Sequence, residues 1–92
     1  MRITEKALQA KIDHLNKITG NPPTPYTRNG ATLKTNIGSY YLGPVHEGWN
    51  LAQIMNEGGG IYSLLFGRTK SELYYQLEDL IQGILIGKEL RP

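Results

Sequence analysis

Two apolar stripes with helical spacing, one at each end of the chain, most constrain what this sequence can fold into. In the first, apolar residues recur about every 3.6 positions over the first turns of the chain, which is typical of an amphipathic α-helix. Thr4 precedes this stripe as an N-cap, and Gly20 followed by two prolines forms a stop signal. The spacing predicts a helix over residues 4–19.

The second stripe opens on a capping box, Thr69-x-x-Glu72, in which each residue can bond to the backbone near the other. Leucine and isoleucine then recur at helical spacing. The pattern predicts a helix over residues 69–87, with Gly87 as its C-cap. Gly83 lies inside this helix, where glycine costs about 1 kcal/mol relative to alanine, so we expect it to admit a closely packed neighbour.

The middle of the chain is typical of turns and strands. Residues 20–30 predict an extended, proline-rich linker that ends on an Asn29-Gly30 turn signal. Residues 31–66 predict a β-meander, because short runs of aromatic and β-branched residues alternate there with glycine. Within it, Gly38 is either a bulge or a division between two strands.

The segment 50–56 is ambiguous, because Asn50 and Gln53 would also form a capping box for a short helix, and we interpret it as a strand. The predicted fold is then α+β, a small α-β-β-β-α domain with two helices on one face of a three-stranded antiparallel sheet. Double-stranded-RNA-binding domains share this order of elements. The similarity is one of topology only, because the last helix starts with no basic cluster beyond Arg68 and Lys70.

The length, cysteine count and charge of the chain exclude several classes of function. A chain of 92 residues with 39% hydrophobic residues can bury one small core, which excludes a two-domain enzyme with a deep site of its own. The absence of cysteine excludes disulfide frameworks and thiolate zinc sites. The net charge of +2 is a mild excess spread along the chain. With no apolar segment of signal-peptide or membrane-span length, we expect a cytoplasmic, non-enzymatic protein without metal or cofactor.

The start of the second predicted helix is the strongest candidate for ligand binding. Unpaired backbone N–H groups and the helix dipole favour an anion at such a position. The run Arg68, Thr69, Lys70 and Ser71 adds two positive charges and two hydroxyls. The alternative is a simple capped helix start, and Glu72 brings a negative charge to the same turn.

Four further residues are candidates for ligand contact. Trp49 and Tyr40 could stack on a base or anchor a protein interface, although Trp49 is equally suited to a core position. Gly59 could let the backbone approach a phosphate closely, and a tight turn is the simpler explanation for it. His46 lies beside Glu47 in a predicted loop, where it could supply a ligand hydrogen bond; catalysis would require a second group and a pocket.

Several stretches of the chain are distinctive in combination. They are ITGNPPTPY at 18–26, NIGSYYL at 36–42, NEGGG at 56–60, KSELYYQL at 70–77 and IQGI at 81–84. Together they resemble a family of small uncharacterised proteins encoded by tailed bacteriophages, over roughly residues 8 to 84. The resemblance implies expression in the cytoplasm of an infected bacterium. Small phage accessory proteins often bind and block a host component, and some of them sequester the nucleotide signals of antiviral systems, so the resemblance implies a role of this class.

We therefore expect a phage accessory protein, active in counter-defence, that sequesters a small anionic, nucleotide-type ligand in a homo-oligomer. A chain this small needs another copy to build a deep pocket. Aromatic residues would stack on the base while Arg68 and Lys70 hold the phosphate. Two alternatives stay open: a direct inhibitor of a host protein, and a nucleic-acid-binding accessory protein whose binding would weaken steeply with salt.

Overall fold

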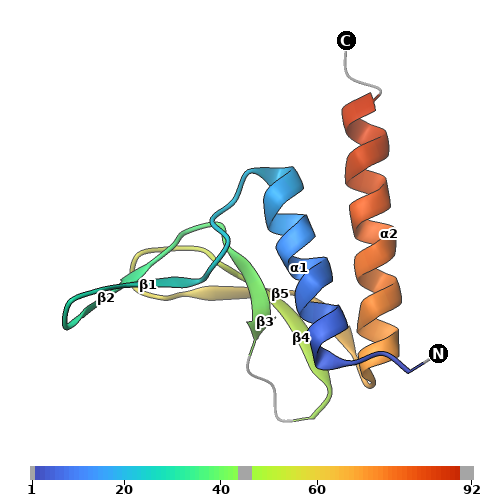
Figure 1. The fold of residues 1–92 in the computed structure, drawn as a ribbon, viewed down its shortest axis with the longest axis horizontal. Helices are drawn as coiled ribbons and strands as arrows, with labels where there is room; N and C mark the ends of the chain where they lie inside the picture. The colour runs from blue at the N-terminus through green and yellow to red at the C-terminus, as the bar shows by residue number, and fades with distance from the viewer. Residues whose placement is uncertain (1, 44–46, 90–92) are drawn as a thin grey trace.

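A computed structural model describes residues 2–43 and 47–89 of the protein (Figure 1). In this part of the chain there are two helices and five strands, which form a two-stranded sheet, β1–β2, and a three-stranded antiparallel sheet of order β3–β4–β5. The predicted α+β class is confirmed. The elements in chain order are α1 (Glu5–Thr19), β1 (Tyr26–Asn29), β2 (Thr32–Thr35), β3 (Tyr40–Gly43), β4 (Trp49–Ile54), β5 (Ile61–Gly67) and α2 (Lys70–Glu89).

Local capping signals set where both helices begin. The Thr4 hydroxyl accepts a hydrogen bond from the Ala7 N–H at 3.1 Å, and Gly20, with φ of +73°, ends α1 in the left-handed conformation that favours glycine. Before α2, the Thr69 hydroxyl accepts from the Glu72 N–H at 3.2 Å. The Glu72 carboxylate accepts in return from the Arg68 N–H at 2.7 Å, one residue earlier than a capping box implies.

The predictions for the two glycines of α2 were wrong. Gly87 does not end the helix, which continues to Glu89. A side chain at Gly83 would meet no atom within 4 Å, so this glycine admits no closely packed neighbour. A side chain at Gly87 would likewise meet no atom within 4 Å, although the neighbouring Lys88 reaches the Ile18 carbonyl near the end of α1.

Residues 20–30 are not a linker throughout, and the strand after them does not join the meander. β1 pairs with β2 in an antiparallel hairpin across a two-residue loop, and Gly30 takes the positive φ of +66° that such a loop requires at its first position. Gly38, with φ of +94°, then separates β2 from β3 instead of forming a bulge. Because β1 carries polar residues on both faces, its sequence lacks the apolar alternation that would predict a strand.

The core lies between the two helices and one face of the three-stranded sheet. α1 and α2 run parallel, because Lys11 pairs with Glu78 at 3.4 Å near their middles and Lys88 reaches the Ile18 carbonyl near their ends (Figure 1). Leu51 faces them from the central strand β4, so residues 50–56 form mainly a strand, as favoured from the sequence. The buried apolar residues of this core are Ile3, Leu8, Ile12, Leu15, Leu51, Leu73, Leu77 and Ile81.

Side-chain amides from the helices pair with both edges of the three-stranded sheet. Asn16 of α1 is 1% exposed; its Nδ2 donates to the Tyr40 carbonyl at 3.0 Å, and its Oδ1 accepts from the Tyr40 N–H at 2.8 Å. Gln76 of α2 donates to the Phe66 carbonyl on β5 at 2.8 Å. Unpaired backbone groups at a strand edge can pair with another chain. These amides occupy such groups at Tyr40 on β3 and at Phe66 on β5, and so block pairing there.

Tyr41 gives the fold a testable pH dependence. Burial raises the pKa of the Tyr41 hydroxyl above its ordinary value of 10.0, and the neighbouring Tyr26 raises it further. Folding therefore favours the neutral phenol, so this stabilisation is complete below the unfolded pKa of about 10 and is lost as the pH rises through the folded pKa. In urea titrations between pH 9 and pH 11.5, we expect Tyr41→Phe to lose less stability than wild type. An equal loss in both proteins would contradict this, and Tyr75→Phe, which removes an exposed hydroxyl, is the control.

Candidate functional site

The start of α2 and the start of β4 meet at one end of the three-stranded sheet. Trp49 pairs in register with Gly67, and Arg68, Thr69, Lys70 and Ser71 follow Gly67 directly. The Lys70 ammonium lies 5.5 Å from the centre of the Trp49 ring, within the range of a cation–π interaction. The structure therefore brings together two of the residue groups that the sequence placed in one site.

A cleft at the same end of the sheet is lined by Glu47, Gly48, Phe66 and Arg68, and we name it the Arg68 cleft. Its volume of about 570 Å³ lies within the range of small-molecule sites. The Phe66 side chain is 48% exposed, so an aromatic surface is available there. Gly48, with φ of +90°, lets its loop approach that ring, because a side chain at Gly48 would stand 2.8 Å from it.

The positive charges of this cleft come from side chains more than from the helix end. The Thr69 hydroxyl already accepts from the Glu72 N–H, and the Glu72 carboxylate accepts from the Arg68 N–H just before the helix, so the donors at this helix start are not all open to an anion. Among the described residues, the ion pair found joins Lys11 to Glu78, far from Arg68. An anion at the cleft would therefore bind chiefly to the Arg68 guanidinium, which shares the lining with Glu47.

Two of the candidate residues, Tyr40 and Gly59, lie elsewhere. Tyr40 packs against the core, with its backbone held by Asn16, which suits a structural role better than stacking on a base. Gly59, with φ of +85°, lies in the β4–β5 turn, separated from Arg68 by the seven residues of β5, roughly 20 Å of strand. His46 lies outside the described residues.

Sequence reasoning missed Phe66 as a site residue. The run Ile61–Phe66 gives no sign of which side chains are exposed, and the ladder between β4 and β5 is irregular. Leu51 is paired with Leu65 while Ala52 is paired with Ser63, which leaves Leu64 without a partner in the ladder. This bulge changes the side-chain alternation along β5, and no residue type in the run marks it.

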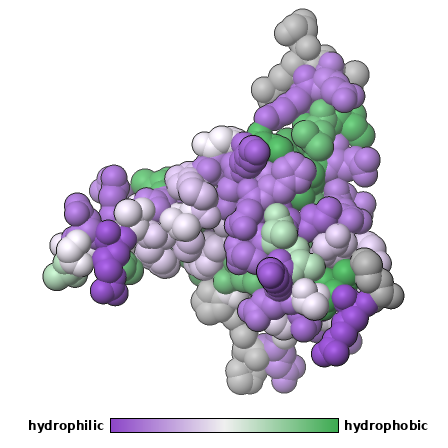
Figure 2. Space-filling model, in the orientation of Figure 1, coloured by the Kyte–Doolittle hydropathy of each residue, from purple (hydrophilic) through white to green (hydrophobic). Residues whose placement is uncertain are grey.

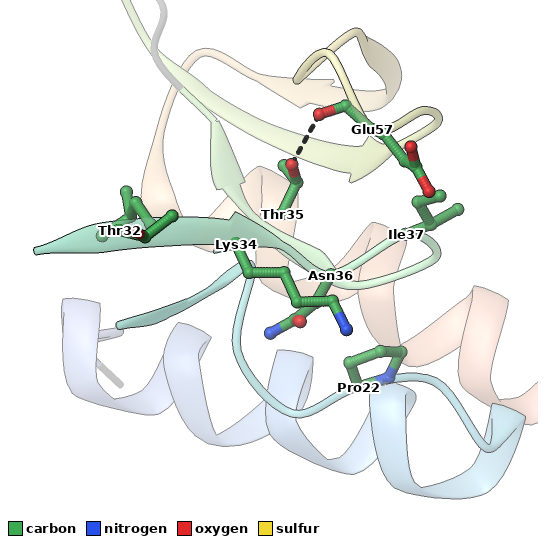
Figure 3. A pocket seen from close by; sticks show the side chains of 8 residues that line it. Pro22, Thr32, Lys34, Thr35, Asn36, Ile37 and Glu57 are labelled. Atoms are coloured by element: carbon green, nitrogen blue, oxygen red, sulfur yellow. Dashed lines mark hydrogen bonds between the residues drawn. The ribbon is translucent and has the colours of Figure 1, made fainter. Parts of the chain in front are cut away.

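A second cleft, of about 580 Å³, lies along β2 and the residues that follow it, which sequence analysis placed in the β-meander (Figure 3). Thr35 donates to the Glu57 carbonyl at 2.8 Å and ties β2 to the β4–β5 turn. The lining includes one cation, Lys34, and the apolar Leu33 and Ile37, but no aromatic ring. This cleft is therefore less suited than the Arg68 cleft to a ligand that is both aromatic and anionic.

The described residues contain neither a metal-binding cluster nor a membrane-spanning helix. No group of three or more histidine, aspartate and glutamate residues there is placed to hold a metal ion. In the same ranges, no helix combines the length and apolarity that crossing a membrane requires. Comparison of the chain with protein-family models, with curated proteins and with solved structures finds no match.

Proposed function

We propose that this chain is a non-enzymatic binding protein that sequesters a small nucleotide-type ligand at the Arg68 cleft. The observation that supports it is the placement of Arg68 and the half-exposed Phe66 in one cleft. A nucleotide joins an aromatic ring to an anion, and the cleft offers a partner for each. Counter-defence in the cytoplasm of a phage-infected bacterium is the setting we propose, from the sequence resemblance.

Each part of the ligand has a partner of matching chemistry in this cleft. The base would stack on the Phe66 ring, an interaction that any base can make. The phosphate would accept paired hydrogen bonds from the Arg68 guanidinium. Because Glu47 shares the lining with Arg68, a phosphodiester with one negative charge fits better than a terminal phosphate with nearly two. We therefore favour cyclic nucleotides and cyclic dinucleotides over nucleoside monophosphates.

Calorimetric titration with these nucleotide classes tests the proposal. We expect saturable binding to wild type and at least a tenfold loss of affinity in Arg68→Ala, because a hydrogen bond to a charged group contributes about 1.5–3 kcal/mol. Arg28→Ala removes the same charge from the exposed strand β1 and should leave affinity unchanged. If no nucleotide releases heat, or if Arg68→Ala binds as wild type does, the proposed function is wrong.

Inhibition of a host protein is the second candidate, favoured by the projecting β1–β2 hairpin (Figure 1). Leu33 and Ile37, on and beside β2, are 55% and 50% exposed and line the second cleft. Such residues are typical anchors of protein interfaces. Recovery of one bacterial protein in stoichiometric amount, with no response to nucleotides, would favour this function over the first.

A further inference from the structure

The outer edge of β5 is more open than that of β3, the other edge strand of the three-stranded sheet. β5 lies at one side of the three-stranded sheet, and the sequence from Gly58 to Gly67 carries no charge. Ile61 and Tyr62 are 44% and 59% exposed. Natural proteins protect edges with charges, prolines or short strands, and the other edge, β3, has four residues and the Asn16 cap. The first half of β5 has no such protection.

The hydrogen bonds around Ile54 show which backbone groups of β5 face outward. The Ile54 N–H donates to Ser39, and the Ile54 carbonyl accepts from Gly38, so both groups of Ile54 are directed away from β5. Ile61 lies opposite Ile54, so its own N–H and carbonyl must point away from β4. By alternation, the backbone groups of Ser63 also point outward and those of Tyr62 point toward β4.

We propose that two copies of this chain associate through this edge, with β5 antiparallel to β5 of the partner subunit. Ile61 would exchange both backbone hydrogen bonds with Ser63 of the partner subunit, and Ser63 would do the same with the partner's Ile61. Tyr62 would then lie beside the partner's Tyr62 on the twofold axis. Pairing would stop where Gln76 closes the edge at Phe66.

The charges at the two ends of β5 favour a second copy as the occupant. Glu57 precedes the uncharged stretch and Arg68 follows it. Antiparallel pairing of two identical strands brings Glu57 near the partner's Arg68, once on each side of the axis. Parallel pairing would set like charges side by side, and an unrelated strand would need its own matching charges. A twofold contact of this kind is the commonest form of closed association.

The accessible surface of the chain is also larger than is typical of a monomeric protein of this mass. Its accessible surface is 6366 Å², about 1,000 Å² above the expectation for a monomeric protein of 10.3 kDa. The radius of gyration, 13.9 Å, likewise exceeds the roughly 12 Å expected for a compact domain of this length. An excess of this size is comparable to the roughly 800 Å² that each partner buries in a standard interface.

This dimer would complete the Arg68 cleft, a consequence that rests on the proposed function. Gly59 and Arg68 lie at opposite ends of β5 within one copy, but antiparallel pairing brings the partner's Gly59 turn beside Phe66 and Arg68. The glycines of that turn would let its backbone approach a phosphate held by Arg68. The open cleft of one copy would thus become a site shared by two.

A single introduced cysteine tests the register of the proposed pair. The natural chain has no cysteine, so Tyr62→Cys would be its only thiol. Opposite residues of a non-hydrogen-bonded antiparallel pair have Cα atoms about 4.5 Å apart, within the range that a disulfide spans. We expect mild oxidation to convert most of Tyr62→Cys to a covalent dimer. Leu33→Cys, equally exposed on the hairpin, should remain mostly uncross-linked; equal cross-linking of both variants would overturn the register.

Light scattering without nucleotide tests the association itself. We expect wild type and Ile61→Ala to have twice the mass of one chain, and Ile61→Pro, which removes one outward N–H while sparing the bonds to β4, to be a monomer. Circular dichroism would show that Ile61→Pro is folded. A monomeric wild type at 100 μM overturns the inference whether or not nucleotide binds.

If the dimer forms, at least tenfold weaker nucleotide binding by Ile61→Pro supports the shared site, and equal binding overturns it.

Discussion

Replacing Asn16 by aspartate is expected to destabilise the fold by about 2–4 kcal/mol at neutral pH. The Asn16 amide pairs with both backbone groups of Tyr40, and it is 1% exposed. An aspartate has the same shape, but its carboxylate has no donor for the Tyr40 carbonyl and would be buried with its charge. Leaving a buried polar group unpaired costs about 1–3 kcal/mol, and more where a charge is involved.

The pH dependence of Asn16→Asp distinguishes a lost hydrogen bond from a general packing defect. A protonated carboxyl can donate to the Tyr40 carbonyl and accept from the Tyr40 N–H, much as the amide does. Folding therefore raises the pKa of the introduced aspartate, so the stability of the variant is fully present below the unfolded pKa of about 3.9 and is lost as pH rises through the folded pKa. The difference from wild type should be small at pH 3 and largest at pH 7.

Urea denaturation at both pH values measures this difference. Gln82→Glu makes the same chemical change on the exposed face of α2 and should shift stability by less than about 0.5 kcal/mol. If the stability difference between Asn16→Asp and wild type is the same at pH 3 and at pH 7, the Tyr40 hydrogen bonds are not its cause.

The helices could be predicted from the sequence because their signals are local. Thr4, Gly20 and the Thr69–Glu72 box each act within one turn of the chain, so their effect does not depend on the rest of the fold. Even so, Gly87 shows the limit of such signals. A glycine ends a helix where its φ becomes positive, and Gly87 has no positive φ and lies inside α2, which continues to Glu89.

The hairpin and the full site could not be predicted, because they depend on contacts between distant residues. β1 shows no apolar alternation, and all its residues are exposed, so only the turn at Gly30 indicates it. Lys70 meets Trp49 because β4 and β5 pair in a register that places Trp49 opposite Gly67. The bulge in that ladder exposes Phe66, and a residue inserted into a ladder is invisible to alternation.

Gly67→Ala and Gly83→Ala make the same chemical change and are expected to have opposite effects. A side chain at Gly67 would stand 2.5 Å from the Leu73 backbone nitrogen and 3.0 Å from the Thr69 carbonyl oxygen. Both are backbone atoms of the first turn of α2, so that turn must move. We expect a loss of about 1–3 kcal/mol, the usual cost of overpacking.

At Gly83 the added methyl group meets no atom within 4 Å, inside a regular helix. Alanine there should stabilise the protein by about 0.5–1 kcal/mol, because glycine loses more backbone entropy when a helix forms. In a domain of this size, a change of 1 kcal/mol shifts Tm by about 4–8 °C, so thermal melts would separate the two variants clearly. Equal shifts would mean that Gly67 is not held by contact with α2.

Gly67 also joins the fold to the proposed site, because it positions Arg68 and lies opposite Trp49. Displacing the first turn of α2 would move Lys70 away from the Trp49 ring, which it approaches to 5.5 Å. Gly67→Ala should therefore change the Trp49 fluorescence of the folded protein as well as its Tm, and Gly83→Ala should change only the Tm. A destabilised Gly67→Ala with unchanged Trp49 emission would place the strain in β5 rather than at the start of α2.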